Sequence, residues 1–386
     1  MNKKHIIRKL KADRYNRFIF NRFKDVYLVG GFIRDLYAGK KSKDRDYIVK
    51  NKPQITAKEL SESIGGRIVR FKEDSTVRLA LKDGTTLDFS KIEKNIPTDL
   101  GRRDFTINSI AFNPESGLID YYNGISDLNN SIIRTVSENN MSNDPLRCLR
   151  AYRMKSELGY NIDCYTISSI IKYKDGLKDI APERITLEFF KLLNGDYYIN
   201  ALTQCLSDGV IYYIISNNIN ILRHNIEKLH DIDGFIEKSP HKIRKYLRLN
   251  CSGNLTNNGM IRLEQIVSGC DIRKLNLKLS NKISRRIIKA DFFLNNVDRL
   301  DLYETFFSSK DMIYDLVCLS GRRDILTAAE RYIRIHSNRL LSSDKIMELT
   351  NLRGKSFGRI LYELNRERFY GRVTTKKQAE EFIRNL

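Results

Sequence analysis

The sequence predicts a small α/β head followed by an elongated, basic, all-α remainder. Short apolar runs separated by turn residues fill the N-terminal third, and helical spacing dominates from about residue 140. The chain has 386 residues, which is too long for a single small domain. We therefore expect a head over residues 1–138, a helical neck over 139–200, and a helical body and tail over 201–386.

Five segments of the head have the composition and alternation of β-strands. They are DVYLVGG (25–31), RDYIVK (45–50), GRIVRF (66–71), TVRLALKDGTTLDFS (76–90) and GLIDYYNG (117–124). The Lys82-Asp83-Gly84 turn divides the fourth segment into two alternating runs and predicts a hairpin. The segment ITAKELSESIG (55–65) predicts a helix with Thr56 as its N-cap and Gly65 near its end.

The segments after residue 140 have helical spacing, with Asp or Pro at their starts and Gly at their ends. DPLRCLRAYRMKSELGY (144–160) and APERITLEFFKLLNG (181–195) follow this pattern. Strand-like segments hardly return before the C-terminus, so we expect the remainder of the chain to be helical.

The charge of the chain indicates the class of its partner. Lys and Arg number 68 against 47 Asp and Glu, which gives a formal net charge of +21. Such a surplus favours a polyanionic partner, most often nucleic acid, over an acidic membrane. We expect no membrane association, because no stretch approaches the roughly 18 apolar residues of a spanning helix and no signal peptide opens the chain. Six cysteines without a C-x-x-C pair predict reduced thiols in the cytoplasm.

The stretch LVGGFIRDLYAGKKSKDRDYIV (28–49) gathers the groups that a nucleotide site needs. On a strand, Asp44 and Asp46 point to the same face, because side chains alternate with a period of two. Two adjacent carboxylates repel each other unless a cation lies between them. This pair therefore suits Mg²⁺ that carries a nucleotide's phosphates.

The glycines of the same stretch suit the phosphates themselves. Gly30 and Gly31 after a strand allow close approach of the backbone, and a helix from about Phe32 would direct its N-terminus to the same place. Arg34, one turn into that helix, could add a charge-assisted hydrogen bond to a triphosphate. A glycine turn followed by solvated charges is the alternative, and the order strand, Gly-Gly, helix, Asp-x-Asp disfavours it.

The helix that starts near Asp144 carries a second candidate site. Arg147, Arg150 and Arg153 follow at three-residue steps and lie along one face with Asp144 at its head. Asp144 accepts hydrogen bonds and Arg147 donates them in a fork, so the two can read the Watson–Crick edge of one cytosine or adenine. Elsewhere such a pair is usually an N-cap with a surface ion pair.

These motifs together resemble the polymerase-β-like nucleotidyltransferase fold, in the family of bacterial tRNA nucleotidyltransferases and poly(A) polymerases. Residues 28–49 resemble its first motif, and DLGRRDFTINSIAFNPESGLIDYYNGISDLNNSIIRTV (99–136) resembles its second motif and the segment that follows. Residues 143–163 look like the base-reading helix, 181–193 like the helix that supports it, and 354–383 like the C-terminal segment. Residues 200–340 match no motif.

The resemblance implies roles in metal and phosphate binding. Asp44 and Asp46 would be catalytic and hold Mg²⁺, and Asp88 would be a third catalytic carboxylate, although a solvent-facing hairpin aspartate is the alternative. Arg103 and Asp104 would contact the phosphate and the sugar of the incoming nucleotide.

The remaining nucleotide-binding residues follow from the same resemblance. Gly31 and Arg34 would hold the triphosphate beside Gly30, and the helix of Asp144, Arg147, Arg150 and Arg153 would bind the nucleotide and read its base. The substrates would be CTP and ATP, and the partner tRNA.

Two departures from the family bear on the product. Asn143 occupies a position where the family usually has Glu, which bears on base selectivity. KIEKNIPT (91–98) is shorter than the flexible loop of members that build the whole CCA end, and short loops are typical of members that add only the two cytosines. Some short-loop members complete the triplet, so the final adenosine stays open here.

Three functions are consistent with these sequence features. The first is template-independent, Mg²⁺-dependent addition of CMP, with or without AMP, to tRNA 3′ ends. The second is a poly(A) polymerase, which shares every motif of the head. The third is a catalytically silent tRNA-binding module, which the intact pair Asp44 and Asp46 disfavours, because unused carboxylates weaken binding to a polyanion.

Overall fold

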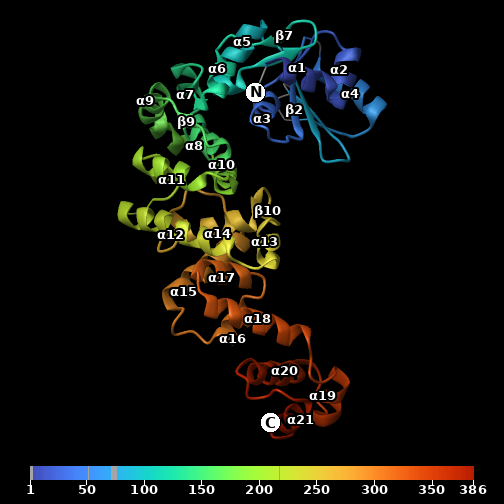
Figure 1. The fold of residues 1–386 in the computed structure, drawn as a ribbon, viewed down its shortest axis with the longest axis vertical. Coiled ribbons are helices and arrows are strands. Elements are labelled where there is room, and N and C mark those ends of the chain that lie inside the picture. The colour runs from blue at the N-terminus through green and yellow to red at the C-terminus, as the bar shows by residue number, and fades with distance from the viewer. Residues whose placement is uncertain (1–2, 51, 71–75, 217) are drawn as a thin grey trace. The chain divides into compact units, whose positions relative to one another are not determined.

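The computed structural model describes residues 3–50, 52–70, 76–216 and 218–386, and the chain divides into two compact units. Unit 1 contains the chain up to Ser216 together with Leu275–Lys278, and unit 2 contains the rest (Figure 1). The boundaries expected at residues 138 and 200 both lie within unit 1 and stay predictions.

A mixed sheet organises the first part of unit 1. Among the described residues it has seven strands in the order β3-β4-β5-β2-β1-β6-β7. The strands are β1 (Val26–Val29), β2 (Asp44–Val49), β3 (Arg67–Arg70), β4 (Thr76–Ala80), β5 (Thr86–Lys91), β6 (Ala111–Asn113) and β7 (Gly117–Ile119). β2 and β5 run parallel, and the other neighbours are antiparallel. This α/β head confirms the predicted fold class for the N-terminal third.

The register of the sheet places an aromatic cluster on one face of β2 and the two aspartates on the other, where Ile48 packs with Val29 and Leu100. Tyr47 pairs with Leu28 on one side and Phe89 on the other, and the rings of Tyr47 and Phe89 stack with their centroids 5.3 Å apart. Phe20, from helix α2 (Arg14–Arg22), contacts Tyr47 edge-on at 6.3 Å. The opposite face of β2 therefore remains for Asp44 and Asp46, as the alternation of the sequence predicts.

The hairpin predicted around Lys82-Asp83-Gly84 is confirmed, whereas helix α4 (Pro53–Ile64) begins before its predicted N-cap. β4 and β5 pair as expected, and Gly84 in the turn has a φ of 80°. The prediction of Thr56 as an N-cap is wrong. Helix α4 already begins at Pro53, whose fixed φ suits the first helical position, and Thr56 is buried inside the helix. Phe71, at the end of one predicted strand, lies outside the described residues.

Helices make up the rest of unit 1. They are α1 (Lys3–Ala12), α3 (Gly31–Tyr37), α5 (Ile96–Gly101), α6 (Gly124–Asn129), α7 (Glu138–Asn143), α8 (Leu146–Leu158), α9 (Cys164–Tyr173), α10 (Pro182–Asn194) and α11 (Tyr198–Ser207). Short 3-10 turns occur at Thr106–Asn108, Lys174–Asp179 and Ile211–Tyr213, and β8 (Ile132–Ile133) pairs with β9 (Asn161–Ile162).

The boundaries of α8 and α10 follow from their sequence. α8 begins directly after Pro145 and ends at Gly159, which has a φ of 73° and so adopts the left-handed conformation that favours glycine. α10 begins with Pro182 and is followed by Gly195. Both predicted helices are therefore confirmed, and α8 and α10 pack against each other (Figure 1).

A short distant segment completes unit 1. Leu275 forms a β-bridge with Ile215, and the amide of Asn276 donates to the carbonyl of Ile214 at 2.9 Å. The amide of Lys278 donates to Oγ1 of Thr186 on α10 at 2.7 Å. These contacts explain why four residues from much later in the sequence belong to unit 1.

Unit 2 is mostly helical, as predicted. Its helices are α12 (Ile219–Glu237), α13 (His241–Leu247), α14 (Asn257–Ile266), α15 (Asn281–Asn296), α16 (Leu302–Ser308), α17 (Ile313–Ser320), α18 (Arg323–Ser337), α19 (Ser343–Thr350), α20 (Gly354–Phe369) and α21 (Lys376–Arg384). A small hairpin of β10 (Asn250–Ser252) and β11 (Leu255–Thr256) and a 3-10 turn at Ile272–Lys274 accompany them. No helix in the described part of the chain is long and apolar enough to cross a membrane.

Unit 2 contains a buried ionic cluster between α14, α15 and α17. Arg286 forms ion pairs with Asp315 and, at 3.3 Å, with Glu264, and the hydroxyl of Tyr246 donates to Asp315 at 2.9 Å. Burial raises the pKa of Glu264 well above its ordinary value, and the nearby Asp315 carboxylate raises it further. Burial likewise raises the pKa of Asp315, although Arg286 opposes that shift. Two carboxyl groups thus share one guanidinium away from water.

Candidate active site

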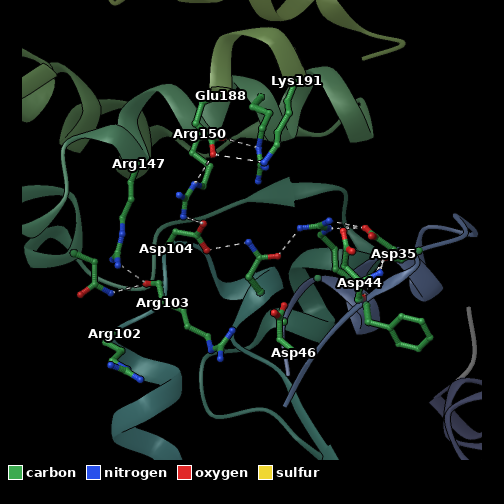
Figure 2. A pocket seen from close by; sticks show the side chains of 18 of the residues that line it. Asp35, Asp44, Asp46, Arg102, Arg103, Asp104, Arg147, Arg150, Glu188 and Lys191 are labelled. Atoms are coloured by element: carbon green, nitrogen blue, oxygen red, sulfur yellow. Dashed lines mark hydrogen bonds and ion pairs between the residues drawn. The ribbon is translucent and has the colours of Figure 1, made fainter. Parts of the chain in front are cut away.

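Unit 1 has a cavity of about 850 Å³ between α8, α10 and the face of the sheet that carries Asp44 and Asp46 (Figure 2). Arginines of α8 enter it from one side, and Asp44 and Asp46 lie on the opposite side. The lining residues are Gly30, Gly31, Phe32, Arg34, Asp35, Ser42, Asp44, Asp46, Arg102, Arg103, Asp104, Asn108, Asn140, Asn143, Arg147, Arg150, Arg153, Glu188 and Lys191.

The register of β2 against β5 explains the acidic side of the cavity. Asp46 pairs with Asp88 across the parallel strands, and Asp44 pairs with Thr86, whose hydroxyl donates to Oδ1 of Asp44 at 2.5 Å. The pKa of the Asp46 carboxyl is raised to about 6, chiefly by burial; Arg103 opposes this shift, and Asp88 and Asp44 add to it. Burial destabilises the ionised form of Asp46, and a cation bound nearby would stabilise that form.

The donor set of this face fits Mg²⁺ bound together with a nucleotide. Mg²⁺ is commonly held by one or two carboxylates plus substrate phosphates, and Asp44 and Asp46 supply those two. Within the described ranges, no group of three or more His, Cys, Asp or Glu side chains could hold a metal by itself.

Asp88 is engaged by a neighbour on the next strand. Nε and Nη2 of Arg78 on β4 each lie 2.7 Å from an oxygen of the Asp88 carboxylate. Asp88 is not among the described residues that line the cavity, although it lies next to Asp46 in the register. Its role as a third catalytic carboxylate stays a prediction.

The glycine turn lies directly against an arginine of the second motif. Gly30 has a φ of 75°, and a Cβ at this position would lie 2.9 Å from Nη1 of Arg103. Gly31 begins α3, one residue earlier than expected. Side chains larger than hydrogen at Gly30 would therefore strain the backbone and displace Arg103.

A chain of hydrogen bonds links α3 to α8 across the floor of the cavity. Arg34 donates to Asp35 at 2.6 Å and to Oδ1 of Asn108 at 2.8 Å, and Nδ2 of Asn108 donates to Asp104 at 2.9 Å. Asp104 also accepts from Nη1 of Arg150 at 3.2 Å. Burial alone would raise the pKa of Asp104, but Arg150 and these hydrogen bonds outweigh it and hold the pKa below its ordinary value.

The arginines of α8 are braced by an acid that the sequence analysis did not single out. Glu188 on α10 is buried, and its Oε2 lies 3.0 Å from Nε of Arg153. Nε of Arg150 lies 3.7 Å from Oε1 of the same residue. The only sequence signal was a charged residue between the apolar positions Ile185 and Phe189 on a helix whose other buried residues are mostly apolar.

Family models match both the head and the helices that follow it. A model described as "Poly A polymerase head domain" matches residues 26–95 and 75–134, and one described as "Probable RNA and SrmB- binding site of polymerase A" matches residues 159–217. A CCA-adding enzyme of Leuconostoc mesenteroides is 31% identical over 208 residues, which cover 49% of this chain and 51% of the relative.

Two further relatives are a tRNA nucleotidyltransferase and a second CCA-adding enzyme. A CC-adding tRNA nucleotidyltransferase of Synechocystis sp. is 33% identical over 195 residues, covering 49% of this chain and 47% of the relative. A CCA-adding enzyme of Bacillus subtilis is 25% identical over 359 residues, covering 88% of this chain and 82% of the relative. The head and the helices that follow it are thus similar to those of tRNA nucleotidyltransferases and poly(A) polymerases.

Solved structures share the fold of this chain. The Thermotoga maritima CCA-adding enzyme complexed with tRNA aligns with a TM-score of 0.77 and 20% identity, covering 99% of this chain and 98% of that one. At this identity the likeness establishes the fold. The alignments with the Leuconostoc and Synechocystis proteins span only about half of those proteins.

Of the two residues expected to read the base, Arg147 lines the cavity and Asp144 does not. Arg147 lines the cavity, donates to the carbonyl of Arg103 at 3.4 Å, and has a buried Nε without a hydrogen-bond acceptor. Asp144 is not among the described cavity-lining residues, and its Oδ2 lies 4.0 Å from Nε of Arg147. Asn143, where the family usually has Glu, does line the cavity. The assignment of the fork stays a prediction.

The segment 91–98, expected from the sequence to be a short loop, contains only a few residues outside regular secondary structure. β5 ends at Lys91 and α5 begins at Ile96, with Asn95 as its N-cap. Only a few residues therefore connect the strand of Asp88 to the helix that precedes Arg103.

Proposed function

We propose that this protein is a template-independent nucleotidyltransferase that adds CMP, with or without AMP, to the 3′ end of tRNA and so builds or repairs the CCA terminus. The observation that carries the proposal is one cavity with a carboxylate pair, Asp44 and Asp46, on one side and the arginines of α8 on the other. Such a cavity can bind the metal and the triphosphate at one end and the base at the other. We further propose that the protein works in the cytoplasm, where its six free cysteines would persist.

The residues of the cavity suit the steps of nucleotidyl transfer. Asp44 and Asp46 would hold Mg²⁺, whose charge would favour deprotonation of the primer 3′-hydroxyl and offset the charge of the leaving pyrophosphate. Arg34 and Arg103 would hold the triphosphate, because guanidinium groups bind phosphate oxygens in a fixed geometry. Gly30 and Gly31 would let the phosphates approach the backbone.

The wall of α8 would hold the rest of the nucleotide. Asp104 orients Arg150 through their ion pair and would contact the sugar. Arg147, together with Asp144, would read the base, and Arg153 would add positive charge beside Glu188. CTP and ATP present an amino group next to a ring acceptor, which matches one acceptor and one donor on the protein.

Incubation of the full chain with Mg²⁺, labelled CTP or ATP, and a tRNA lacking its last three nucleotides tests the proposal. CMP should be added to this tRNA and not to an unrelated RNA. Long runs of AMP on both RNAs would identify a poly(A) polymerase, and binding of tRNA without any addition would identify a silent binding module. The Asp46→Asn variant should lose addition of CMP. Glu62→Gln, which changes an exposed acid on α4, is its control and should keep that activity.

We expect the enzyme to stop after two cytosines when CTP and ATP are supplied together. The connection between Lys91 and Ile96 is short, so it has little travel with which to reshape the pocket for adenine. Sequencing the products made on a tRNA without CCA checks this prediction, and a dominant CCA end would contradict it.

A further inference from the structure

The Asp144 carboxylate is held by a residue of α10 that no part of the proposed chemistry uses. Nη2 of Arg184 lies 3.1 Å from both oxygens of the Asp144 carboxylate. Asp144 itself lies between α7 and α8 with φ −143° and ψ 89°, so no helical turn fixes its side chain. The terminal torsion of an aspartate is broad, and an external partner must therefore set the plane of the carboxylate.

Arg184 belongs to one face of α10. Arg184, Glu188 and Lys191 follow at steps of four and three residues and so lie on the same side of the helix. Glu188 and Lys191 line the cavity, and Glu188 braces Arg150 and Arg153. The same face thus contacts both the arginines of α8 and the aspartate that precedes them.

We propose that Arg184 is a positioning residue that sets base selectivity by fixing the Asp144 carboxylate. This inference rests on the proposed function. Cytosine and adenine present an amino group where uracil and guanine present a carbonyl oxygen. A carboxylate held in one orientation accepts from the amino group and repels the carbonyl oxygen, whereas a carboxylate free to rotate avoids that repulsion. Part of the selectivity is thus a penalty against the wrong base.

The test compares Arg184→Gln and Arg184→Lys with the wild-type chain. Lys172→Gln is the matched control, because it removes a cation from the exposed pair between Lys172 and Glu138 on the neighbouring helices α9 and α7. Two readouts are measured for CTP, ATP, UTP and GTP. They are kcat/KM for incorporation into tRNA lacking CCA, and equilibrium binding of each nucleotide with Mg²⁺ in the absence of RNA.

Arg184→Gln should lower the preference for CTP over UTP at least about ten-fold in both readouts, since a loss of about 1.4 kcal/mol is ten-fold. Arg184→Lys, which keeps the charge and lacks the planar fork, should restore part of the preference. Lys172→Gln should leave the preference within about two-fold. In a second measurement, Asp144→Asn should change the preference little more once Arg184 is already Gln.

If Arg184→Gln instead lowered kcat/KM and binding equally for all four nucleotides, the preference for CTP would be preserved. That result would overturn the inference and leave Arg184 as a structural residue. A variant that unfolds is recognised by its melting curve, and Arg184→Lys then carries the test. The proposed function fails in a different way: wild-type protein would then add no CMP or AMP to tRNA, while the binding readout still measures the selectivity of the pocket.

Discussion

Units 1 and 2 each contain a cluster of arginines and carboxylates, and the two clusters differ in charge balance and in access. The cavity of unit 1 brings several arginines to two bracing acids, Asp104 and Glu188, and buried Nε atoms of Arg103 and Arg147 have no hydrogen-bond acceptor. In unit 2, Arg286 pairs with both Glu264 and Asp315. The same residue types therefore yield a cationic open site in one unit and an acid-rich closed cluster in the other.

The difference teaches how to distinguish a binding site from a structural ion cluster. An arginine excess beside an open cavity leaves donors for an anion from outside. A closed cluster with more acids than bases must keep protons or lose stability, because burial penalises each unpaired charge. Substitutions that change the number of acids or bases in either cluster should therefore have different effects.

The largest effect should follow removal of the acids that face the cationic side of unit 1. Asp46→Ala or Asp44→Ala should lower nucleotide addition by several orders of magnitude, since metal charge stabilisation supplies several kcal/mol. Binding of tRNA, measured by filter retention, should change little, because phosphate contacts dominate RNA affinity. A variant that keeps a tenth of wild-type activity would exclude the metal role.

Removal of Arg286 from the buried cluster of unit 2 should destabilise that unit. Arg286→Met leaves two buried carboxyl groups without the guanidinium that pairs with them, which typically costs about 3 to 5 kcal/mol. Urea unfolding followed by circular dichroism measures the loss. Arg285→Met, at the exposed neighbouring position of α15, is the control and should change stability by less than about 0.5 kcal/mol. Equal effects of both variants would show that the cluster does not stabilise unit 2.

Removal of one cation from the open cluster should change selectivity and leave stability nearly unaltered. Arg147→Ala should raise UTP and GTP incorporation relative to CTP, with a loss of discrimination of about 1 to 3 kcal/mol. Competition among the four nucleotides on tRNA lacking CCA provides the measurement. If the order of preference survived and only the rate fell, Arg147 would have a structural role.

The smallest effect should be a dependence of unit 2 on pH. Glu264 and Asp315 have raised pKa values in the folded chain, with Asp315 at about 7, so the folded cluster retains a proton that the unfolded chain releases near pH 4. The stability that this proton supplies is complete below about pH 4 and is lost as pH rises through the folded values. The wild-type free energy of unfolding should therefore fall between pH 5 and pH 8 by on the order of 1 to 2 kcal/mol.

Glu264→Gln removes one of the two acids and should flatten that dependence. The control is Glu348→Gln, an exposed acid on α19. Both variants and the wild-type chain are compared by urea unfolding at each pH. A wild-type profile that is flat, or that rises with pH, would contradict the shared proton.

The sequence allowed the cavity to be predicted where residues close in the chain form it. The alternation of β2 placed Asp44 and Asp46 on one face of that strand. The three-residue spacing in α8 placed Arg147, Arg150 and Arg153 along one face of that helix. Those arguments need only local geometry.

Residues brought together by tertiary packing were missed. Glu188 meets Arg153 only because α10 packs on α8, and Arg78 meets Asp88 only through the register of β4 on β5. The cluster of Arg286 joins α14, α15 and α17, and no spacing in the sequence announces it. Side-chain partners across elements depend on packing that a single sequence does not specify.

The segment Leu275–Lys278 has a consequence for synthesis on the ribosome. Chains are made from the N-terminus, and domains commonly fold as they emerge. Unit 1 cannot do so completely, because its bridge at Ile215 and the hydrogen bond to Thr186 need residues translated after the first helices of unit 2. The nascent chain therefore leaves the carbonyl of Ile214 and Oγ1 of Thr186 without these hydrogen bonds during that interval. A ribosome that pauses before residue 275 would prolong this state, so codon choice between residues 217 and 274 should affect the yield of folded protein.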